Sequence, residues 1–321
     1  MNEEYLWDRS GPPDPEIEQL ERTFAPLRYR HRPTLVRRPH PAPRVWLAAA
    51  ATIFVGAVAL WRSHAPAPPA TGWQVASVEG AAKMGRDDAN VSMTLRAGQL
   101  LRTGSASELR LQADDFGQID VFSDSELRAA STKQLQLNRG TLHAFIWARP
   151  GQFVVDTPSA RATDLGCMYD ITVDSTGNGL LKVTLGWVAF QHAGRESFIP
   201  AGAACVTRKK LGPGIPYYQD APEDLRAALA GFENGDRDQL GKILDAARPR
   251  DGLTLWHVLA RVREQDRGVV FDRFAQLVSL PPEVSREGAL RLDAKTMDLC
   301  WNALNLENTE WWRGWERKWA E

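Results

Sequence analysis

The longest uninterrupted apolar run in the chain extends from Val45 to Trp61 and has an arginine at each end. As a helix rising 1.5 Å per residue it would be about 25 Å long, which is close to the shortest length that crosses a bilayer. Trp46 and Trp61 lie at its two ends, where amphipathic rings favour the headgroup level. The pattern predicts a transmembrane helix at residues 44–62 and a single-pass membrane protein.

The basic residues around this run are unevenly placed, because six arginines lie between Arg28 and Arg44 and only Arg62 follows before Lys83. The positive-inside rule therefore predicts a cytoplasmic N-terminus and extracytoplasmic C-terminal domains. A cleaved signal peptide is the alternative interpretation. The 44 residues before the run and the proline-rich stretch after it favour an uncleaved anchor.

Residues 1–43 form a proline-rich tail with one predicted amphipathic helix that begins near Asp14 and Pro15. Its apolar side chains recur near the helical period and make one stripe: Ile17, Leu20, Phe24 and Leu27. We interpret this stripe as a partner-binding surface. A helix lying on the membrane and a leader that only sets topology are the alternatives.

Between residues 73 and 218 the pattern changes to short alternating apolar and polar runs separated by turn residues, after a Pro/Ala linker at 63–72. The runs that read as strands are 75–78, 108–112, 118–122, 141–147, 153–156, 169–173, 180–185 and 187–192. Many short strands at this spacing predict an all-β domain built as a sandwich, roll or solenoid-like structure.

Residues 219–321 lose the alternation and show apolar residues at helical spacing, which predicts an all-α domain. The expected helices cover residues 222–232, 236–247, 253–262, 268–278 and 293–304. Beyond them, Trp311, Trp315 and Trp319 form an i, i+4, i+8 stripe beside Trp312. This stripe either packs on the helical domain or presents an aromatic surface to a partner.

Several ordered motifs within the predicted β domain make it resemble the FecR domain of bacterial membrane-anchored signalling proteins. The motifs, in chain order, are Thr103-Gly104-Ser105-Ala106-Ser107, Asp115-Phe116-Gly117-Gln118, Gly140-Thr141-Leu142, Phe153 to Pro158, Leu165-Gly166-Cys167 and Gly186-Trp187-Val188. No single motif is specific to this family. Their order over about 115 residues, beside one apolar run, is fairly specific. These residues resemble fold determinants rather than a binding site.

The resemblance implies a FecR-like extracytoplasmic domain in a signal-transducing protein of the bacterial inner membrane. Such a protein would sense or scaffold partners outside this membrane, with an envelope protein or a glycan as candidate ligands, and its tail would contact a cytoplasmic sigma factor. The tail is shorter than in the sigma-regulating members of the family. A membrane-anchored envelope scaffold or ligand-binding module with no sigma-regulating role is therefore the alternative, and a hydrolase built from distant residues is a third hypothesis.

Cys167 and Cys205 both fall in the predicted exported domain, where disulfides persist, and each lies in or beside a predicted strand. We expect them to form a disulfide; two separate buried thiols are the alternative. Cys300 lies in a helical pattern and reads as a core residue.

Candidate chemistry is otherwise sparse. The six histidines are scattered over different segments, and the sequence contains no phosphate-binding loop, no nucleophile elbow and no paired metal ligands. We therefore expect no catalytic residues, no metal and no cofactor. A formal net charge of −1 gives no argument for binding nucleic acid.

Overall fold

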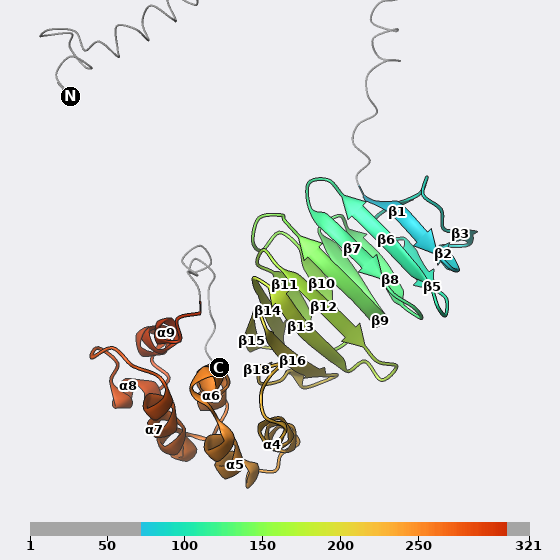
Figure 1. The fold of residues 1–321 in the computed structure, drawn as a ribbon. Helices are drawn as coiled ribbons and strands as arrows, with labels where there is room; N and C mark the ends of the chain where they lie inside the picture. Colours follow the sequence, from blue (N-terminus) through green and yellow to red (C-terminus); the bar gives the residue numbers. More distant parts are fainter. Residues whose placement is uncertain (1–71, 307–321) are drawn as a thin grey trace, which may run out of the picture. The chain divides into compact units, whose positions relative to one another are not determined.

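The computed structural model describes residues 72–306 and places a β region before a helical region (Figure 1). Three sequence predictions lie outside these residues. They are the tail helix with Ile17, Leu20, Phe24 and Leu27, the apolar span at 44–62, and the tryptophan stripe beyond Glu310.

The predicted single-pass fold class needs a correction. None of the helices between residues 72 and 306 combines the length and the apolar composition that crossing a bilayer requires. The structure supports a mostly β protein with a C-terminal helical part, and the single-pass assignment is not carried further.

The β region consists of two sheets, called sheet A and sheet B, that share the long strand β9 (Gln134–Ile146). Sheet A has the order β4–β1–β6–β7–β9–β12–β13–β16, and both β17 and β18 pair with β16. The bounds of its other strands are β1 Trp73–Glu79, β4 Thr94–Leu95, β6 Glu108–Ala113, β7 Gly117–Val121, β12 Met168–Val173, β13 Gly179–Leu185, β16 Ala203–Arg208, β17 Gly212–Pro213 and β18 Tyr217–Tyr218.

Sheet B has the order β3–β2–β5–β8–β9–β10–β11–β14–β15. Its remaining strands are β2 Ala82–Met84, β3 Asp87–Asp88, β5 Leu100–Thr103, β8 Glu126–Ser131, β10 Val154–Asp156, β11 Arg161–Asp164, β14 Trp187–His192 and β15 Arg195–Pro200. The β9–β10 pair is parallel, and the other pairs in both sheets are antiparallel. Alternate residues of the strands are buried, so the core lies between the two sheets.

Strand β9 joins the sheets because its backbone changes direction at Gly140. Its first part pairs with β8 and β10 in sheet B, and its second part pairs with β7 and β12 in sheet A. Gly140 has a φ of +94°, and a Cβ built there would lie 2.1 Å from Ser125 Oγ. A side chain cannot be placed at this bend without moving the neighbouring strand.

The chain passes from sheet A back to sheet B at Gly186, between β13 and β14. Gly186 has a φ of +71°, and a Cβ there would lie 2.0 Å from the carbonyl oxygen of Gly166, which itself precedes the passage into β12. Gly140, Gly166 and Gly186 of the sequence resemblance therefore lie where the chain changes sheet, whereas Gly117 begins β7 in a hairpin within sheet A.

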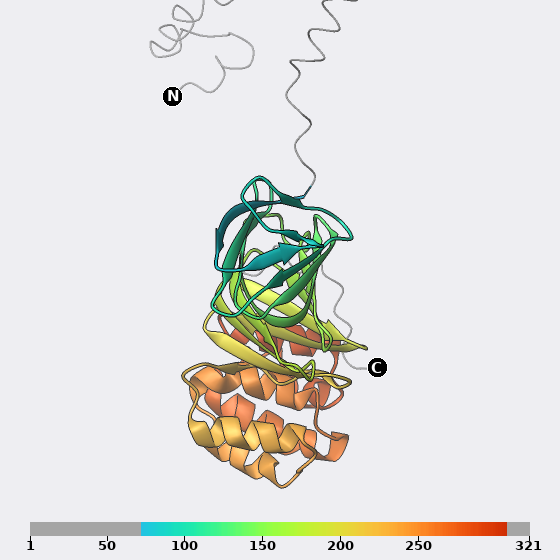
Figure 2. The same cartoon turned by 90° about the vertical axis from the view of Figure 1, so that its right-hand side faces the viewer.

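The helical region follows β18 and lies against the late strands of the β region, orange against yellow in Figure 2. Its elements are α4 Glu223–Glu233, α5 Gln239–Ala246, η2 Pro249–Asp251, α6 Gly252–Leu259, η3 Glu264–Asp266, α7 Arg267–Leu277, α8 Arg286–Leu290 and α9 Ala294–Ala303. All eight residues of α6 are buried, so this helix lies at the centre of the region. It packs on α7 and α9 and, through His257, on strand β15.

The close approach at Gly186 gives a prediction about stability. Replacing Gly186 by Ala adds a Cβ into the Gly166 carbonyl as well as positive-φ strain, and should destabilise the fold by about 3 kcal/mol or more. Gly98 also has a positive φ, but a Cβ there meets no atom within 4 Å. Gly98→Ala should therefore cost only about 1–2 kcal/mol of backbone strain.

Urea unfolding of the wild type and both variants measures the difference. Equal losses in the two variants would contradict the assignment of Gly186 as a sterically closed passage between the sheets.

Candidate binding surface on sheet A

The solvent-facing side of sheet A carries a row of charged residues in register across five neighbouring strands. The members of the row are Arg110, Asp120, His143, Asp170 and Lys182. Arg110 makes a bidentate contact with Asp120, at 2.6 Å and 3.0 Å, and this contact raises the pKa of the guanidinium. His143 Nδ1 lies 2.8 Å from Asp170 Oδ1. The polar side chains in the middle of the row are thus already paired within the sheet.

Beside this row lies a second one in which apolar side chains face solvent. Phe145 pairs with Met168, and Met168 pairs with Leu185 across a bulge in β13. Trp147 follows Phe145 on the same face, with ring centroids 5.4 Å apart and an edge-on geometry. We call Phe145, Trp147, Met168 and Leu185 the sheet A patch.

The exposure of this patch is unusual for a sheet of a folded domain. Phe145 is 37% exposed, Trp147 46% and Leu185 56%. The Trp147 indole nitrogen donates to the Asp114 carbonyl at 3.0 Å, which fixes the ring at the end of the strand. Contiguous apolar side chains on an exposed surface mark interaction sites. A fixed tryptophan is also a frequent anchor of protein interfaces.

The helical region closes the outer edge of sheet B through polar contacts that are buried. The backbone N–H of Phe198 in β15 donates to Nε2 of His257 at 3.2 Å, while Nδ1 of His257 contacts the Leu253 carbonyl at 2.9 Å. Burial and the nearby Arg261 charge lower the pKa of His257 to about 3, so its ring is neutral at pH 7 and Nε2 accepts.

Arg261 completes this contact on the same strand edge. Its Nη2 donates to the Glu196 carbonyl at 3.0 Å and to Ser197 Oγ at 2.6 Å. Burial lowers the pKa of Arg261 to about 10, and Glu233 lies 3.7 Å away as its partially compensating charge. Burial likewise raises the pKa of Glu233.

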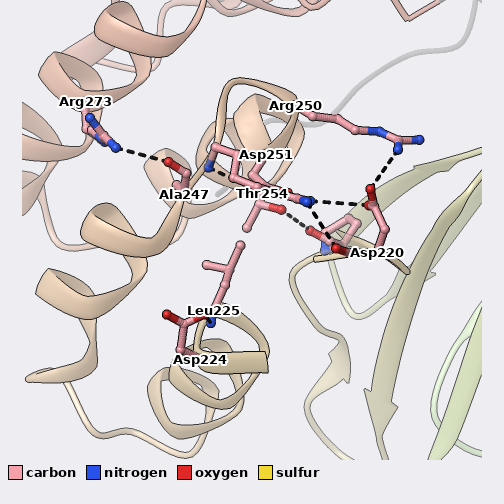
Figure 3. Close-up of polar contacts among 10 residues, drawn as sticks. Asp220, Asp224, Leu225, Ala247, Arg250, Asp251, Thr254 and Arg273 are labelled. Atoms are coloured by element: carbon pink, nitrogen blue, oxygen red, sulfur yellow. Dashed lines mark hydrogen bonds and ion pairs between the residues drawn. The ribbon is translucent and has the colours of Figure 1, made fainter. Parts of the chain in front are cut away.

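A second polar cluster ties the helical region to the residues on either side of β18 (Figure 3). Arg250 donates to Asp220 at 3.1 Å, and the Thr254 hydroxyl donates to the Pro216 carbonyl at 2.9 Å. Within the helices, Arg273 donates to the Ala247 carbonyl at 3.1 Å. These groups hold helices in place, and we assign them no binding role.

One buried acid in the β region has an unusual environment. Asp164 accepts from the Gly166 backbone N–H at 2.7 Å and from the Cys167 thiol at 2.5 Å. Burial raises the pKa of Asp164 to about 7, despite these two hydrogen bonds, and also raises the pKa of the Cys167 thiol. Both residues are 1% exposed, so the pair has no route to a substrate. Its consequence is for stability.

The predicted disulfide between Cys167 and Cys205 is wrong in this structure, because both cysteines are free and buried. Strand register gives the reason. Cys205 pairs with Leu181, which pairs with Ile171, so Cys205 lies two strands across from Cys167 and four residues along. From strand geometry the two Cα atoms are about 15 Å apart, well beyond the reach of a disulfide.

No group of three potential metal ligands (His, Cys, Asp or Glu) occurs between residues 72 and 306. The sheet A patch and the charged row were not among the predicted site residues. A signal for the patch is present in the sequence, because the residues on both faces of this strand are apolar apart from His143. The segment reads Leu142-His143-Ala144-Phe145-Ile146-Trp147. A strand with one solvent-exposed face normally alternates apolar and polar residues.

No family model matches the chain, and no curated protein matches it either. Two crystal structures of a candidate anti-sigma factor from Parabacteroides distasonis ATCC 8503, at 1.65 Å and 2.50 Å resolution, are similar to it, each with 13% identity and a TM-score of 0.33. Each match covers 41% of this chain, and 65% and 64% of those chains, which is less than two thirds of their length. This match is weak, and no family model confirms the FecR resemblance.

The buried Asp164 gives a prediction about pH. Its pKa rises from an ordinary 3.8 to about 7 on folding, so the folded state binds the proton more tightly. The free energy by which Asp164 stabilises the fold is fully present below about pH 4 and is lost as the pH rises to 7. This loss amounts to at most about 4 kcal/mol. Asp164→Asn should therefore gain stability relative to the wild type as the pH rises from 5 to 8.

Urea unfolding at both pH values measures this change, with the exposed Asp88→Asn as the matched control. The assignment fails if Asp164→Asn and Asp88→Asn show the same dependence on pH as the wild type.

Proposed function

We propose that this protein is a FecR-like regulatory protein whose β region binds another protein through the outer face of sheet A. The exposed sheet A patch beside a row of paired charges is the observation that supports this proposal. The sequence resemblance supports the FecR-like part, because three of its glycines, Gly140, Gly166 and Gly186, lie at passages between the two sheets. The proposal includes no enzymatic activity.

The two rows would contribute differently to binding. Covering Phe145, Trp147 and Leu185 removes apolar surface from water, which is worth about 25 cal/mol per Å². Arg110 and Asp120 are already paired, as are His143 and Asp170. These charges therefore add orientation and selectivity more than affinity. We expect the aromatic residues to dominate the binding free energy.

A finer part of the proposal concerns the first 43 residues. We propose that the stripe of Ile17, Leu20, Phe24 and Leu27 binds a sigma factor in the manner of an amphipathic helix in a groove. An envelope scaffold or ligand-binding module with no sigma-regulating role is the alternative. The sheet A patch serves either role.

A pull-down with the full-length chain tests both contacts. The bait variants are Trp147→Ser/Leu185→Ser for the patch and Leu20→Asp/Phe24→Asp for the tail. Leu211→Ser/Val269→Ser, two residues 52% and 55% exposed elsewhere, is the surface control. We expect the patch variant to lose the partner of the β region by at least about tenfold, since two anchors at more than 1 kcal/mol each are removed. The tail variant should lose any sigma factor that the wild type recovers, and the control should lose neither partner.

The two parts of the proposal can fail separately. If the wild-type chain recovers no sigma factor, sigma regulation is contradicted. If the patch variant keeps every partner that the wild type binds, the outer face of sheet A is not the binding surface.

A further inference from the structure

One end of the sheet A patch is close in sequence to a residue that contacts the helical region. Leu185, at one end of the patch, is two residues before Trp187. The Trp187 ring packs against Trp301 of α9 with centroids 5.8 Å apart, and both rings are almost fully buried. The helical region is therefore in contact with the strand that directly follows the end of the patch.

The described part of the chain ends shortly after Trp301. Leu306 lies five residues after Trp301 and packs against the core. The remaining segment, residues 307–321, has 15 residues and could span about 22 Å as a helix or about 50 Å when extended. Phe145 and Leu185 are separated by two strand spacings, which is about 10 Å. When extended, residues 307–321 are several times longer than the patch is wide.

The composition of this segment suits an apolar sheet face. It contains Trp311, Trp312, Trp315 and Trp319, four of the twelve tryptophans of the chain. Three of them recur at four-residue intervals, which would place them on one side of a helix. A segment attached this close to its site has an effective concentration in the millimolar range, so modest apolar contact is enough to keep the site filled.

We propose that the C-terminal segment, residues 307–321, binds the sheet A patch of its own chain and so competes with any partner for this face. The competition rests on the proposed function, whereas binding of the segment to the patch does not. A partner would then have to displace the tryptophan segment, which makes access to the patch a regulated step.

Hydroxyl-radical footprinting of the isolated protein tests the proposal, because tryptophan and methionine react readily when they are accessible. The full-length chain is compared with a chain that ends at Glu310 and with the full-length variant Trp311→Ser/Trp315→Ser/Trp319→Ser. We expect oxidation of Trp147 and Met168 to increase at least threefold in both altered chains. Met84, which is 2% exposed in the β core, should remain protected in all three and reports that the fold is intact.

Each other outcome overturns the proposal. Equal oxidation of Trp147 and Met168 in the three proteins means that the segment does not cover the patch. Increased oxidation confined to Trp256 and Trp301 means that the segment packs on the helical region instead. Protection that disappears on tenfold dilution means that a second copy covers the patch. None of these measurements requires a partner, so their failure is distinct from failure of the proposed binding function.

Discussion

The structure depends on closure of one strand edge. Strand β15 ends sheet B and would present unpaired backbone groups to solvent, which is an aggregation hazard for an edge strand. Instead, Phe198 donates to a neutral His257 and the Glu196 carbonyl accepts from Arg261. His257 lies on α6 and Arg261 lies two residues after its end, so the helical region covers this edge of the β region. A protonated His257 could not accept this hydrogen bond, and burial keeps its pKa near 3.

This closure determines which surfaces remain for binding. The helical region packs against strands β14 and β15. The aromatic side chains at this contact are Trp187, Phe198, Trp256 and Trp301. The outer face of sheet A is not covered among residues 72–306, and its apolar row ends at Leu185, two residues before Trp187 of this aromatic cluster. The proposed binding face and its proposed intramolecular competitor both follow from that arrangement.

Much of the secondary structure could be predicted from local patterns. All eight predicted strands overlap observed strands, because alternating burial repeats every two residues in the sequence. The five predicted helices within the described residues are also present as α4, α5, α6, α7 and α9. The two-residue strands β3 and β4 were missed because two residues carry no period. The six-residue strands β8, β15 and β16 were also missed.

Long-range features could not be predicted in the same way. Pairing register placed Cys205 opposite Leu181, and nothing in the spacing of two cysteines encodes that register. The passage of β9 between sheets depends on one positive-φ glycine within an otherwise regular strand. His257 appeared as one of six scattered histidines, and its role as an edge acceptor requires the tertiary position of α6. The strand that carries Phe145 and Trp147 is apolar in the sequence. Which of its faces is exposed to solvent depends on where the second sheet packs, and the sequence does not show this.

Hydrogen exchange of the Phe198 amide tests the central claim most directly. If α6 closes the edge of sheet B, this amide should exchange as slowly as amides of the neighbouring interior strand β14, and His257→Ala should accelerate it selectively. Exchange of Phe198 within seconds in the wild type, while β14 stays protected, would show an open edge and contradict the account.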